Sequence, residues 1–564
     1  MTRAQAMSLI VPAPQPYSET PMPQKIEDIS VLIVESNAAM RTQIRNMLAL
    51  CGISKVGLAV TAGVAIRKLR DQNYDIILCE YHLGEGQDGQ HLLEDLRQHH
   101  LIPLATLFLM ITGESQYERV VSAAELAPND YILKPFSSDK LLGRLSRALE
   151  KRDAFLPTYK LIESGAAFEA IESCRRGEVE YTQYLIDFLR LRAELHISAG
   201  QADEAQQIYK QVMSSKAVPW AKLGLAKTLF MQKNFGEAEE QLEELLSENS
   251  QFLDAYDWLA KTREAAGRLQ EAKETLQDAV KVSPHTMRRL RKLGEVAAEV
   301  GDMETATKNF SEVVRKGKFS DFRDPEDHVA LVRAQLGMGD VTAANTTLRD
   351  LDRSMDGLPK TALCKALSTA MVATKTGDSE AANAALNDAI RFNDPRLGAS
   401  MHLKKELARI CIENNQDDKA AGVIMDIMRH AADDSAVETI KNMLVELGRP
   451  ELGENLALSV RTEVRNIMTE GAHLAQSGDY DGAVRQMLQA VERLPGNTQV
   501  LFNASLALLK HIEHNGWNEH FARSIKDFIE RVKRQDPGNQ RLAAMIAFFH
   551  SLMKQNGIRP EQIR

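Results

Sequence analysis

The 564-residue chain has few aromatic residues, few cysteines and no excess of basic charge. Its five cysteines are odd in number, scattered and free of C-x-x-C spacing, which excludes a disulfide framework and favours buried thiols in a reducing cytoplasm. The net charge of −9 implies no basic face, so we expect no nucleic-acid partner. No apolar run approaches the ~20 residues of a membrane helix. We therefore expect a cytoplasmic protein without membrane insertion.

Motifs for nucleotide binding and hydrolysis are missing as well. The sequence contains no P-loop, no G-x-S-x-G and no dinucleotide fingerprint, so we expect no enzymatic activity. Residues 1–27 hold five prolines and an apolar stretch too short for a signal peptide. This composition predicts a disordered tail.

Residues 28–152 alternate short apolar runs with amphipathic stretches. The apolar runs predict strands at Ser30–Glu35, Lys55–Ala59, Asp75–Cys79, Leu107–Thr112 and Asp130–Leu133. Helices are expected between and after them, at Ala38–Leu50, up to Leu69, near His91–His99, from Ser115 and from Ser138. This alternation predicts an α/β domain with a doubly wound, parallel, five-stranded sheet.

The stretch Tyr74–Gly89, YDIILCEYHLGEGQDG, is the most informative part of this domain. Its buried strand delivers one carboxylate, Glu80, to the strand's carboxyl end. In open α/β sheets, reactive groups gather at that edge. We therefore expect Glu80 to mark the functional site.

Four segments in order resemble the receiver domain of response regulators. They are Val31–Asn37 (VLIVESN), the Glu80 strand, Met110–Gly113 (MITG) and Tyr131–Phe136 (YILKPF). The resemblance implies a flavodoxin-like fold, an acidic pair that holds Mg²⁺ and an aspartate that accepts a phosphoryl group. It also implies a Thr/Ser and a Lys that sense the phosphate, and an aromatic switch residue.

The chain follows this pattern only in part. The matching positions are Thr112, Lys134 and Tyr131. The acceptor position holds Glu80 instead of aspartate, and the acidic pair is Glu35-Ser36, so one carboxylate is missing. Asp88 and Gly89 match the loop after the acceptor, where the resemblance implies a structural aspartate.

These departures change the expected chemistry. Mg²⁺ requires near-octahedral oxygen ligands, and Ser36 supplies a neutral hydroxyl where the resemblance implies a second carboxylate. Glutamate carries its carboxylate one methylene, roughly 1.5 Å, further toward Thr112 and Lys134. We expect Glu80 to act as a pseudo-phosphoacceptor that partly imitates the phosphorylated state through a charge-assisted bond to Lys134. We expect no cofactor, with Glu35 and Glu80 as metal ligands only if magnesium binds.

Beyond Pro157, which is expected to end the last helix of the domain, strand patterns disappear and an internal repeat begins. Alanines recur at Ala205, Ala238, Ala272, Ala306, Ala344, Ala382, Ala420 and Ala483. Five residues earlier stands a turn position: Gly200, Lys233, Gly267, Gly301, Gly339, Gly377, Asn415 and Gly478. Small residues allow antiparallel helices to approach closely, and glycine suits the left-handed turn between them.

These repeats resemble tetratricopeptide repeats. The resemblance implies linker helices at 153–179, a solenoid at 180–497 and capping helices at 498–564, with long helices at Thr498–Asp536 and Gln540–Gln555. Its concave face is expected to bind protein partners. Candidates on that face are Trp220, Lys227, Phe230, Asp257, Lys261, Arg288 and Arg291. A run of glutamates from Glu237 to Glu248 is expected to be a solvated helix face.

The favoured hypothesis is a response-regulator-like signalling protein whose altered receiver regulates protein–protein interactions made by a solenoid scaffold. The surface around Tyr131 is expected to dock onto the solenoid or onto another protein, such as a sensor kinase or another regulator. One alternative is a conventional phosphorylatable two-component regulator. Another is a structural assembly scaffold whose inert receiver serves as a unit for homodimer formation.

Overall fold

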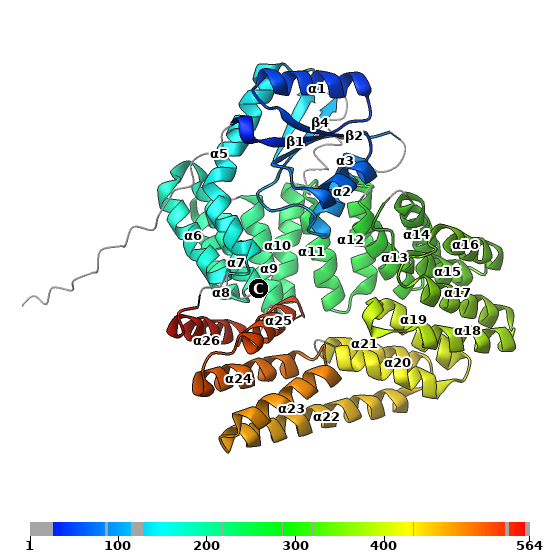
Figure 1. Ribbon diagram of the computed structural model, residues 1–564. Helices are drawn as coiled ribbons and strands as arrows, with labels where there is room; N and C mark the ends of the chain where they lie inside the picture. The colour runs from blue at the N-terminus through cyan, green and yellow to red at the C-terminus, as the bar shows by residue number, and fades with distance from the viewer. Residues whose placement is uncertain are drawn as a thin grey trace, which may run out of the picture.

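The computed structural model describes residues 26–84, 88–113, 128–215, 218–284, 286–318, 320–431, 434–535 and 541–558. The chain begins with a parallel sheet of five strands in the order β2-β1-β3-β4-β5 (Figure 1). The strands are β1 (Ser30–Val34), β2 (Lys55–Ala59), β3 (Ile76–Glu80), β4 (Leu107–Gly113) and β5 (Asp130–Lys134). This sheet confirms the predicted fold class.

Helices cover both faces of the sheet. They are α1 (Ala38–Leu50), α2 (Ala62–Asp71), α3 (Gly89–Gln98) and α5 (Ser138–Glu163). Alternate strand residues enter two apolar clusters, one with α2 and α3 and the other with α1 and α5. The strands read as continuous apolar runs because both faces are buried. The helix expected from Ser115 lies outside the described residues.

Helix α5 corrects the prediction made at Pro157. The helix runs through Pro157 to Glu163, although proline removes one hydrogen bond from a helix interior. Packing on both sides of Pro157 offsets that loss. Phe155 stacks on Phe188 with ring centroids 3.9 Å apart, and the hydroxyls of Thr158 and Ser173 lie 2.8 Å apart.

Consecutive helices pack in pairs through the remainder of the described chain. They are α6 (Ala167–Glu180), α7 (Leu185–Ser198), α8 (Ala202–Ser215), α9 (Pro219–Met231), α10 (Phe235–Glu248), α11 (Leu253–Ala265), α12 (Leu269–Val282), α13 (Met287–Glu299), α14 (Met303–Gly317), α15 (Glu326–Gly337), α16 (Val341–Ser354), α17 (Thr361–Thr376), α18 (Ser379–Phe392), α19 (Met401–Glu413), α20 (Asp417–His430), α21 (Asp434–Glu446), α22 (Pro450–Gln476), α23 (Tyr480–Arg493), α24 (Thr498–Asn515), α25 (Glu519–Gln535) and α26 (Leu542–Gln555). This run of helices confirms the predicted solenoid.

The repeat pattern has the expected structural basis. The recurring alanines are at most 1% exposed, because each lies where two helices cross. The turn glycines all have positive φ, and the two exceptions, Lys233 and Asn415, adopt it too, at 62° and 55°. At Gly294 an added Cβ would lie 2.9 Å from the ring of Phe310, so this crossing requires glycine.

The C-terminal helices differ from the prediction and bring the two ends of the solenoid together. The expected long helix from Thr498 is broken at Gly516, where φ is +90°, which separates α24 from α25. The last helix, α26, lies against α6 (Figure 1). His550 forms an ion pair with Glu169 at 3.3 Å, and its ring meets that of Phe168 edge-on.

Two further observations concern the chain as a whole. All five cysteines are free thiols, and all except Cys51 are buried. In the described ranges, no helix has both the length and the apolar character needed to cross a membrane.

Candidate functional site

Four predicted site residues converge at the carboxyl edge of the sheet. Glu35 follows β1, and Glu80 ends β3. Thr112 lies in β4 and Lys134 ends the neighbouring β5, which pairs with β4 in parallel register. Parallel strands end at one edge, so side chains that are distant in sequence become neighbours there.

Lys134 connects the two carboxylates of this site. Its Nζ donates to Glu35 Oε2 at 3.0 Å and also to Glu80 Oε2. Glu35 is 3% exposed and Glu80 is 7% exposed. Two buried carboxylates therefore share one ammonium group, and the local formal charge is −1.

Backbone amides hold the second oxygen of each carboxylate. Glu35 Oε1 accepts from the N–H of Asn37 at 2.9 Å, and Glu80 Oε1 accepts from the N–H of His82 at 3.2 Å. Arg41 Nη1 donates to the carbonyls of Glu35 and Ser36 at 2.6 and 2.7 Å. Both carboxylates are thus fixed in position.

The pKa of Lys134 reflects two opposing effects. Burial alone would lower it, but hydrogen bonds to Glu80 and Glu35 outweigh burial and raise the pKa above the ordinary lysine value. Lys134 is therefore an ammonium throughout the physiological range. It supplies the positive charge of the site.

The residues of this pocket do not fit a magnesium ion. Ser36 is exposed and lies outside the group formed by Glu35, Glu80 and Lys134. Mg²⁺ needs several converging oxygens, whereas here two carboxylates converge on an ammonium. In the part of the chain that the structure describes, no cluster of three or more His, Cys, Asp or Glu is placed to hold a metal.

The remaining predicted pocket residues are also placed. Thr112 is fully buried, and its hydroxyl donates to the carbonyl of Gly113 at 3.5 Å. Tyr131 is half-buried with its hydroxyl out of solvent, and burial raises its pKa.

Asp88 caps α3 by accepting from the N–H of His91 at 2.8 Å. An added Cβ at Gly89 would lie 2.5 Å from the carbonyl of Glu80, so the loop passes too close for any side chain.

The predicted partner-binding residues lie on α9, α11 and α13, the first helices of three successive pairs. Trp220 packs edge-on against Tyr209, with its ring below Arg190. Phe230 packs against Trp258, which the sequence analysis missed, with centroids 5.5 Å apart.

Lysines lie over this aromatic pair. Lys261 Nζ is 4.4 Å from the centroid of Trp258 and 5.0 Å from that of Phe230. Lys227 Nζ is 5.5 Å from Trp258. These four residues form a cation–π cluster between α9 and α11.

The charged candidates are engaged within the solenoid. Asp257 accepts from Arg288 at 2.9 Å and from Arg289 at 2.8 and 2.9 Å. Arg291 makes a bidentate pair with Asp327 at 2.6 and 2.9 Å. Burial alone would lower the pKa of Arg291, but this pair outweighs burial and raises it. These contacts join α13 to the repeats on either side.

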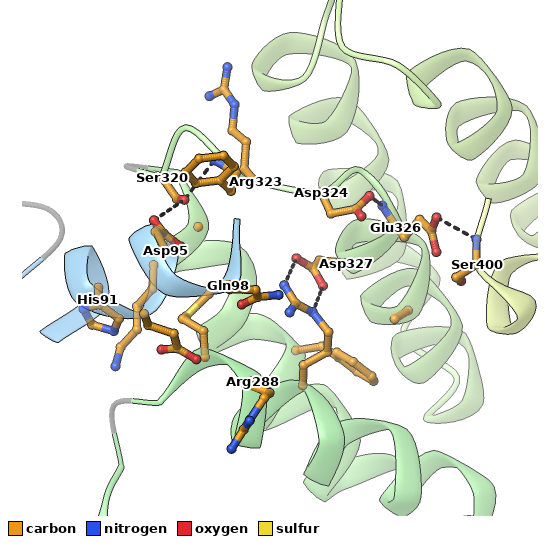
Figure 2. Close-up of a pocket in the computed structure, with 18 of the residues that line it drawn as sticks. His91, Asp95, Gln98, Arg288, Ser320, Arg323, Asp324, Glu326, Asp327 and Ser400 are labelled. Atoms are coloured by element: carbon orange, nitrogen blue, oxygen red, sulfur yellow. Dashed lines mark hydrogen bonds and ion pairs between the residues drawn. The ribbon is translucent and has the colours of Figure 1, made fainter. Parts of the chain in front are cut away.

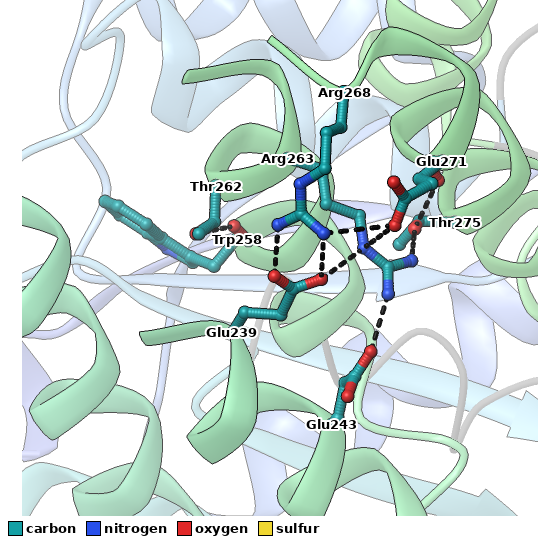
Figure 3. Close-up of polar contacts among 8 residues, drawn as sticks. All are labelled: Glu239, Glu243, Trp258, Thr262, Arg263, Arg268, Glu271 and Thr275. Carbon is teal, nitrogen blue, oxygen red and sulfur yellow. Dashed lines mark hydrogen bonds and ion pairs between the residues drawn. The ribbon is translucent and has the colours of Figure 1, made fainter. Parts of the chain in front are cut away.

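The glutamate run on α10 is more than the solvated face that the sequence predicted. Glu239 accepts from Arg263 at 2.9 Å and from Arg268 Nη1 at 3.1 Å, and Arg263 also donates to Glu243 at 2.6 Å (Figure 3). The side chains of Glu239 and Arg263 are only 14% and 16% exposed. Successive repeats are therefore joined by buried charge, which periodicity alone does not reveal.

The N-terminal domain contacts the solenoid through α2 and α3, a site that the sequence did not indicate. The contact is made by residues 320–325, between α14 and α15, which we call the docking loop (Figure 2). His99 stacks on Phe322, with centroids 3.7 Å apart and ring planes 11° from parallel. Ser320 donates to Asp95 at 3.0 Å, and Arg70 pairs with Asp321 at 3.3 Å.

This contact bears on one expectation. The surface around Tyr131 was expected to dock onto the solenoid or onto another protein, whereas the contact with the docking loop is made by α2 and α3. Tyr131 packs against the same apolar cluster as these two helices, and docking of its surface onto another protein stays a prediction. Arg288 and Arg291 line the same cavity as α3. Two predicted partner-binding residues thus lie beside the chain's own first domain.

Comparisons with known proteins agree with this architecture. A profile of the response regulator receiver domain matches residues 31–146, and a tetratricopeptide repeat profile matches residues 196–257 and 229–294. The KDP operon transcriptional regulatory protein KdpE of Escherichia coli is 30% identical over 191 residues, which cover 34% of this chain and 82% of KdpE. The chain belongs to the response-regulator family.

Other relatives cover less of this response regulator. Chemotaxis protein CheY-3 of Vibrio cholerae is 27% identical over 125 residues, 22% of this chain and 95% of CheY-3. The solved structure of NtrX from Brucella abortus is similar at 26% identity over 25% of this chain, with a TM-score of 0.21, and the chain spans only 29% of that structure. This response regulator is a signalling protein that joins a receiver to repeats of a kind that mediate protein–protein interactions.

Proposed function

We propose that this response regulator controls protein–protein interactions of its solenoid through a receiver that does not use aspartyl phosphorylation. The bridge from Lys134 to Glu35 and Glu80 is the observation that carries this proposal. In it, Glu80 occupies the acceptor position and Lys134 takes the place of the divalent cation. No catalytic activity and no cofactor form part of the mechanism.

Charge explains why phosphoryl transfer is disfavoured in this pocket. A phosphoryl group adds between one and a half and two negative charges, roughly. The pocket already has a formal charge of −1, with Lys134 as the cation bonded to both carboxylates. Transfer depends on positioning and on cations that neutralise the equatorial oxygens. One shared ammonium cannot serve both carboxylates and a phosphoryl group.

The same bridge imitates part of an activated receiver. Lys134 is drawn to an anion at the end of β3, as it would be to a phosphoryl group, and the aromatic ring at Tyr131 is packed inward. A single carboxylate carries less charge than a phosphoryl group, so the imitation is incomplete. The receiver is thus held in one state, and partners, not phosphate, change the output.

Incubation with acetyl phosphate and Mg²⁺, followed by intact mass measurement, tests this proposal. The wild-type chain should gain no phosphoryl group. The matched variant carries Glu80→Asp and Ser36→Asp, which shorten the acceptor and restore the second carboxylate, and it should gain one. A stable, acid-labile adduct on wild-type Glu80 would refute the proposal.

Two further measurements separate this proposal from its alternatives. Mg²⁺ binding that is lost in Glu35→Gln would indicate a conventional phosphorylatable regulator. Capture of partners by the full chain and by Glu80→Gln separates a regulating receiver from an inert one. The proposal requires the two to differ, because Glu80→Gln removes a charge from the pocket.

A further inference from the structure

The receiver joins the repeats at two separate places (Figure 1). At the first, α5 leaves the sheet and continues as one helix that packs against α6 of the first repeat. At the second, α2 and α3 meet the docking loop. Along the chain, the helices from α8 to α12 lie between these two places. The receiver therefore spans an arc of the solenoid, which we call the braced arc.

The connection through α5 is firmly held. Arg152, whose side chain is only 4% exposed, pairs at 3.4 Å with Asp75, the residue before β3. In the last turn of α5, the carboxylate of Glu163 accepts a hydrogen bond at 2.7 Å from the N–H of Leu104 in the receiver. The ring stack described above fixes α5 to α7 as well. The receiver, α5 and the first repeat helices therefore form one body.

The contact with the docking loop is the weaker of the two. It includes the ring stack, the hydroxyl–carboxylate bond and the surface ion pair described above, and a bond from the backbone N–H of Arg288 to Glu94. A cavity of about 300 Å³ lies between α3, α13 and the docking loop (Figure 2). Domains joined by small, polar contacts generally move relative to one another. We therefore expect the receiver to open at this place first.

The braced arc is able to change its curvature. Its helices pack on their neighbours in chain order, and each repeat adds a small rotation to the superhelix. Small changes at successive helix contacts therefore add up along the arc. The receiver has a core on both faces of its sheet, so the distance that it spans is constant. While it is docked, it opposes any change of curvature beneath it.

We propose that the docked receiver is a brace that fixes the curvature of the solenoid from α8 to α12. When the docking loop is released, α5 keeps the receiver attached and the braced arc becomes free to bend. The cation–π cluster lies in this arc, so bending changes the spacing of α9 and α11, which carry it. A partner that binds one curvature better than another then shifts docking, because the two equilibria are linked. This inference goes beyond the proposed function and holds whatever the chemistry of Glu80.

Spin labels measure the curvature in the full chain. Gln207→Cys on α8 and Lys308→Cys on α14 carry nitroxides at exposed positions, each two residues after the recurring alanine of its repeat. Double electron–electron resonance gives the distribution of distances between the two labels. A control pair, Thr346→Cys and Gly422→Cys, occupies the same position in two later repeats, outside the braced arc. Every chain also carries Cys51→Ser, because the other four native thiols are buried.

The docking contact is opened from either side. Arg70→Ala with His99→Ala removes the receiver's part of the contact, and Phe322→Ala removes the part made by the docking loop. Faster hydrogen exchange in the docking loop verifies that each chain has opened, and circular dichroism checks folding. The matched control is Arg67→Ala with Asp71→Ala, at exposed positions of α2.

We expect one narrow distribution across the braced arc in the otherwise unchanged chain and in the matched control. In both opened chains it should become at least twofold wider, whereas the distribution of the control pair should keep its width. A distribution across the arc that opening does not change overturns the proposal. So do an equal broadening of the control pair, which would mean general loosening, and a contact that none of the substitutions opens. A phosphoryl adduct on Glu80 would instead refute the proposed function and leave these distances unaffected.

Discussion

The imidazole ring of His99 lies flat on the phenyl ring of Phe322, with centroids 3.7 Å apart. His99 follows α3 of the receiver, and Phe322 belongs to the docking loop of the solenoid. Arg70 also lies over the ring of Phe322, with its Cζ 5.5 Å from the ring centroid. One loop residue thus joins two helices of the receiver to the repeats.

Mild acid should loosen this contact. Burial lowers the pKa of His99, although Asp95 partly opposes the shift, so the docked state favours the neutral ring. The undocked state binds the proton more readily, and docking is therefore complete above the ordinary histidine pKa and weakens as pH falls below it. Exchange of the amides in residues 320–325, corrected for its intrinsic pH dependence, should rise several-fold between about pH 7.5 and about pH 5.5.

The matched control for this pH dependence is His99→Phe, which keeps a flat ring and removes the proton site. Its exchange should hardly change over the same range. Burial raises the pKa of Glu94, so protonation of Glu94 favours the docked state and opposes the effect of His99. An equal pH response in wild type and His99→Phe would contradict this assignment.

Replacing Lys134 should destabilise the receiver. In Lys134→Met the buried carboxylates of Glu35 and Glu80 lose their shared cation, which we expect to cost roughly 3 kcal/mol of unfolding free energy. Adding Glu80→Gln should recover part of the loss, because only one charge then remains. Urea unfolding measures both effects, and Lys140→Met, at an exposed position of α5, is the control.

The charge network on α10 gives a test with a neighbouring control. Glu239→Ala should lower the unfolding free energy by about 2 kcal/mol, because Arg263 and Arg268 lose the carboxylate that joins them. Glu240→Ala, one residue further on and exposed, should change it little. Equal losses would mean that Glu239 stabilises the helix itself and not the contact between repeats.

The repeat turns offer a pair of opposite substitutions. Lys233 has φ of 62°, so Lys233→Gly removes left-handed strain and should raise the unfolding free energy by about 0.5–1 kcal/mol. Gly267 occupies the equivalent turn with φ of 78°, and Gly267→Ala should lower it by about 1 kcal/mol. Thermal unfolding followed by circular dichroism compares the two. Changes of the same sign would contradict the role given to these turns.

The elements that were predicted well are those that repeat or alternate in the sequence. The strand around Glu80 and the crossing alanines such as Ala272 follow from periods that reflect burial directly. Lys134 reaches Glu80 because the strand order of the sheet fixes where the strands end. The breaks at Pro157 and Gly516 were misjudged for opposite reasons. Packing of Phe155 overrides a helix breaker, whereas at Gly516 the backbone takes a positive φ that ends the helix.

The docking contact could not be read from the sequence. Arg70 and Asp321 are separated by 251 positions, and neither belongs to a motif. Nothing in the composition of the connection between α14 and α15 distinguishes a surface loop from one that contacts another domain. Trp258 was missed for a similar reason. It lies on the first helix of its repeat, but it does not belong to the recurring pattern from which the repeats were predicted.

The seam between His550 and Glu169 gives the repeats a property that an open array lacks. A solenoid with free ends can change its curvature at any point along its length. In this solenoid α26 contacts α6, so a change of curvature must strain or break the contact between His550 and Glu169. The seam lies beside the end of α5, the helix that leaves the receiver, so strain in the seam would arise next to the connection between the repeats and the receiver.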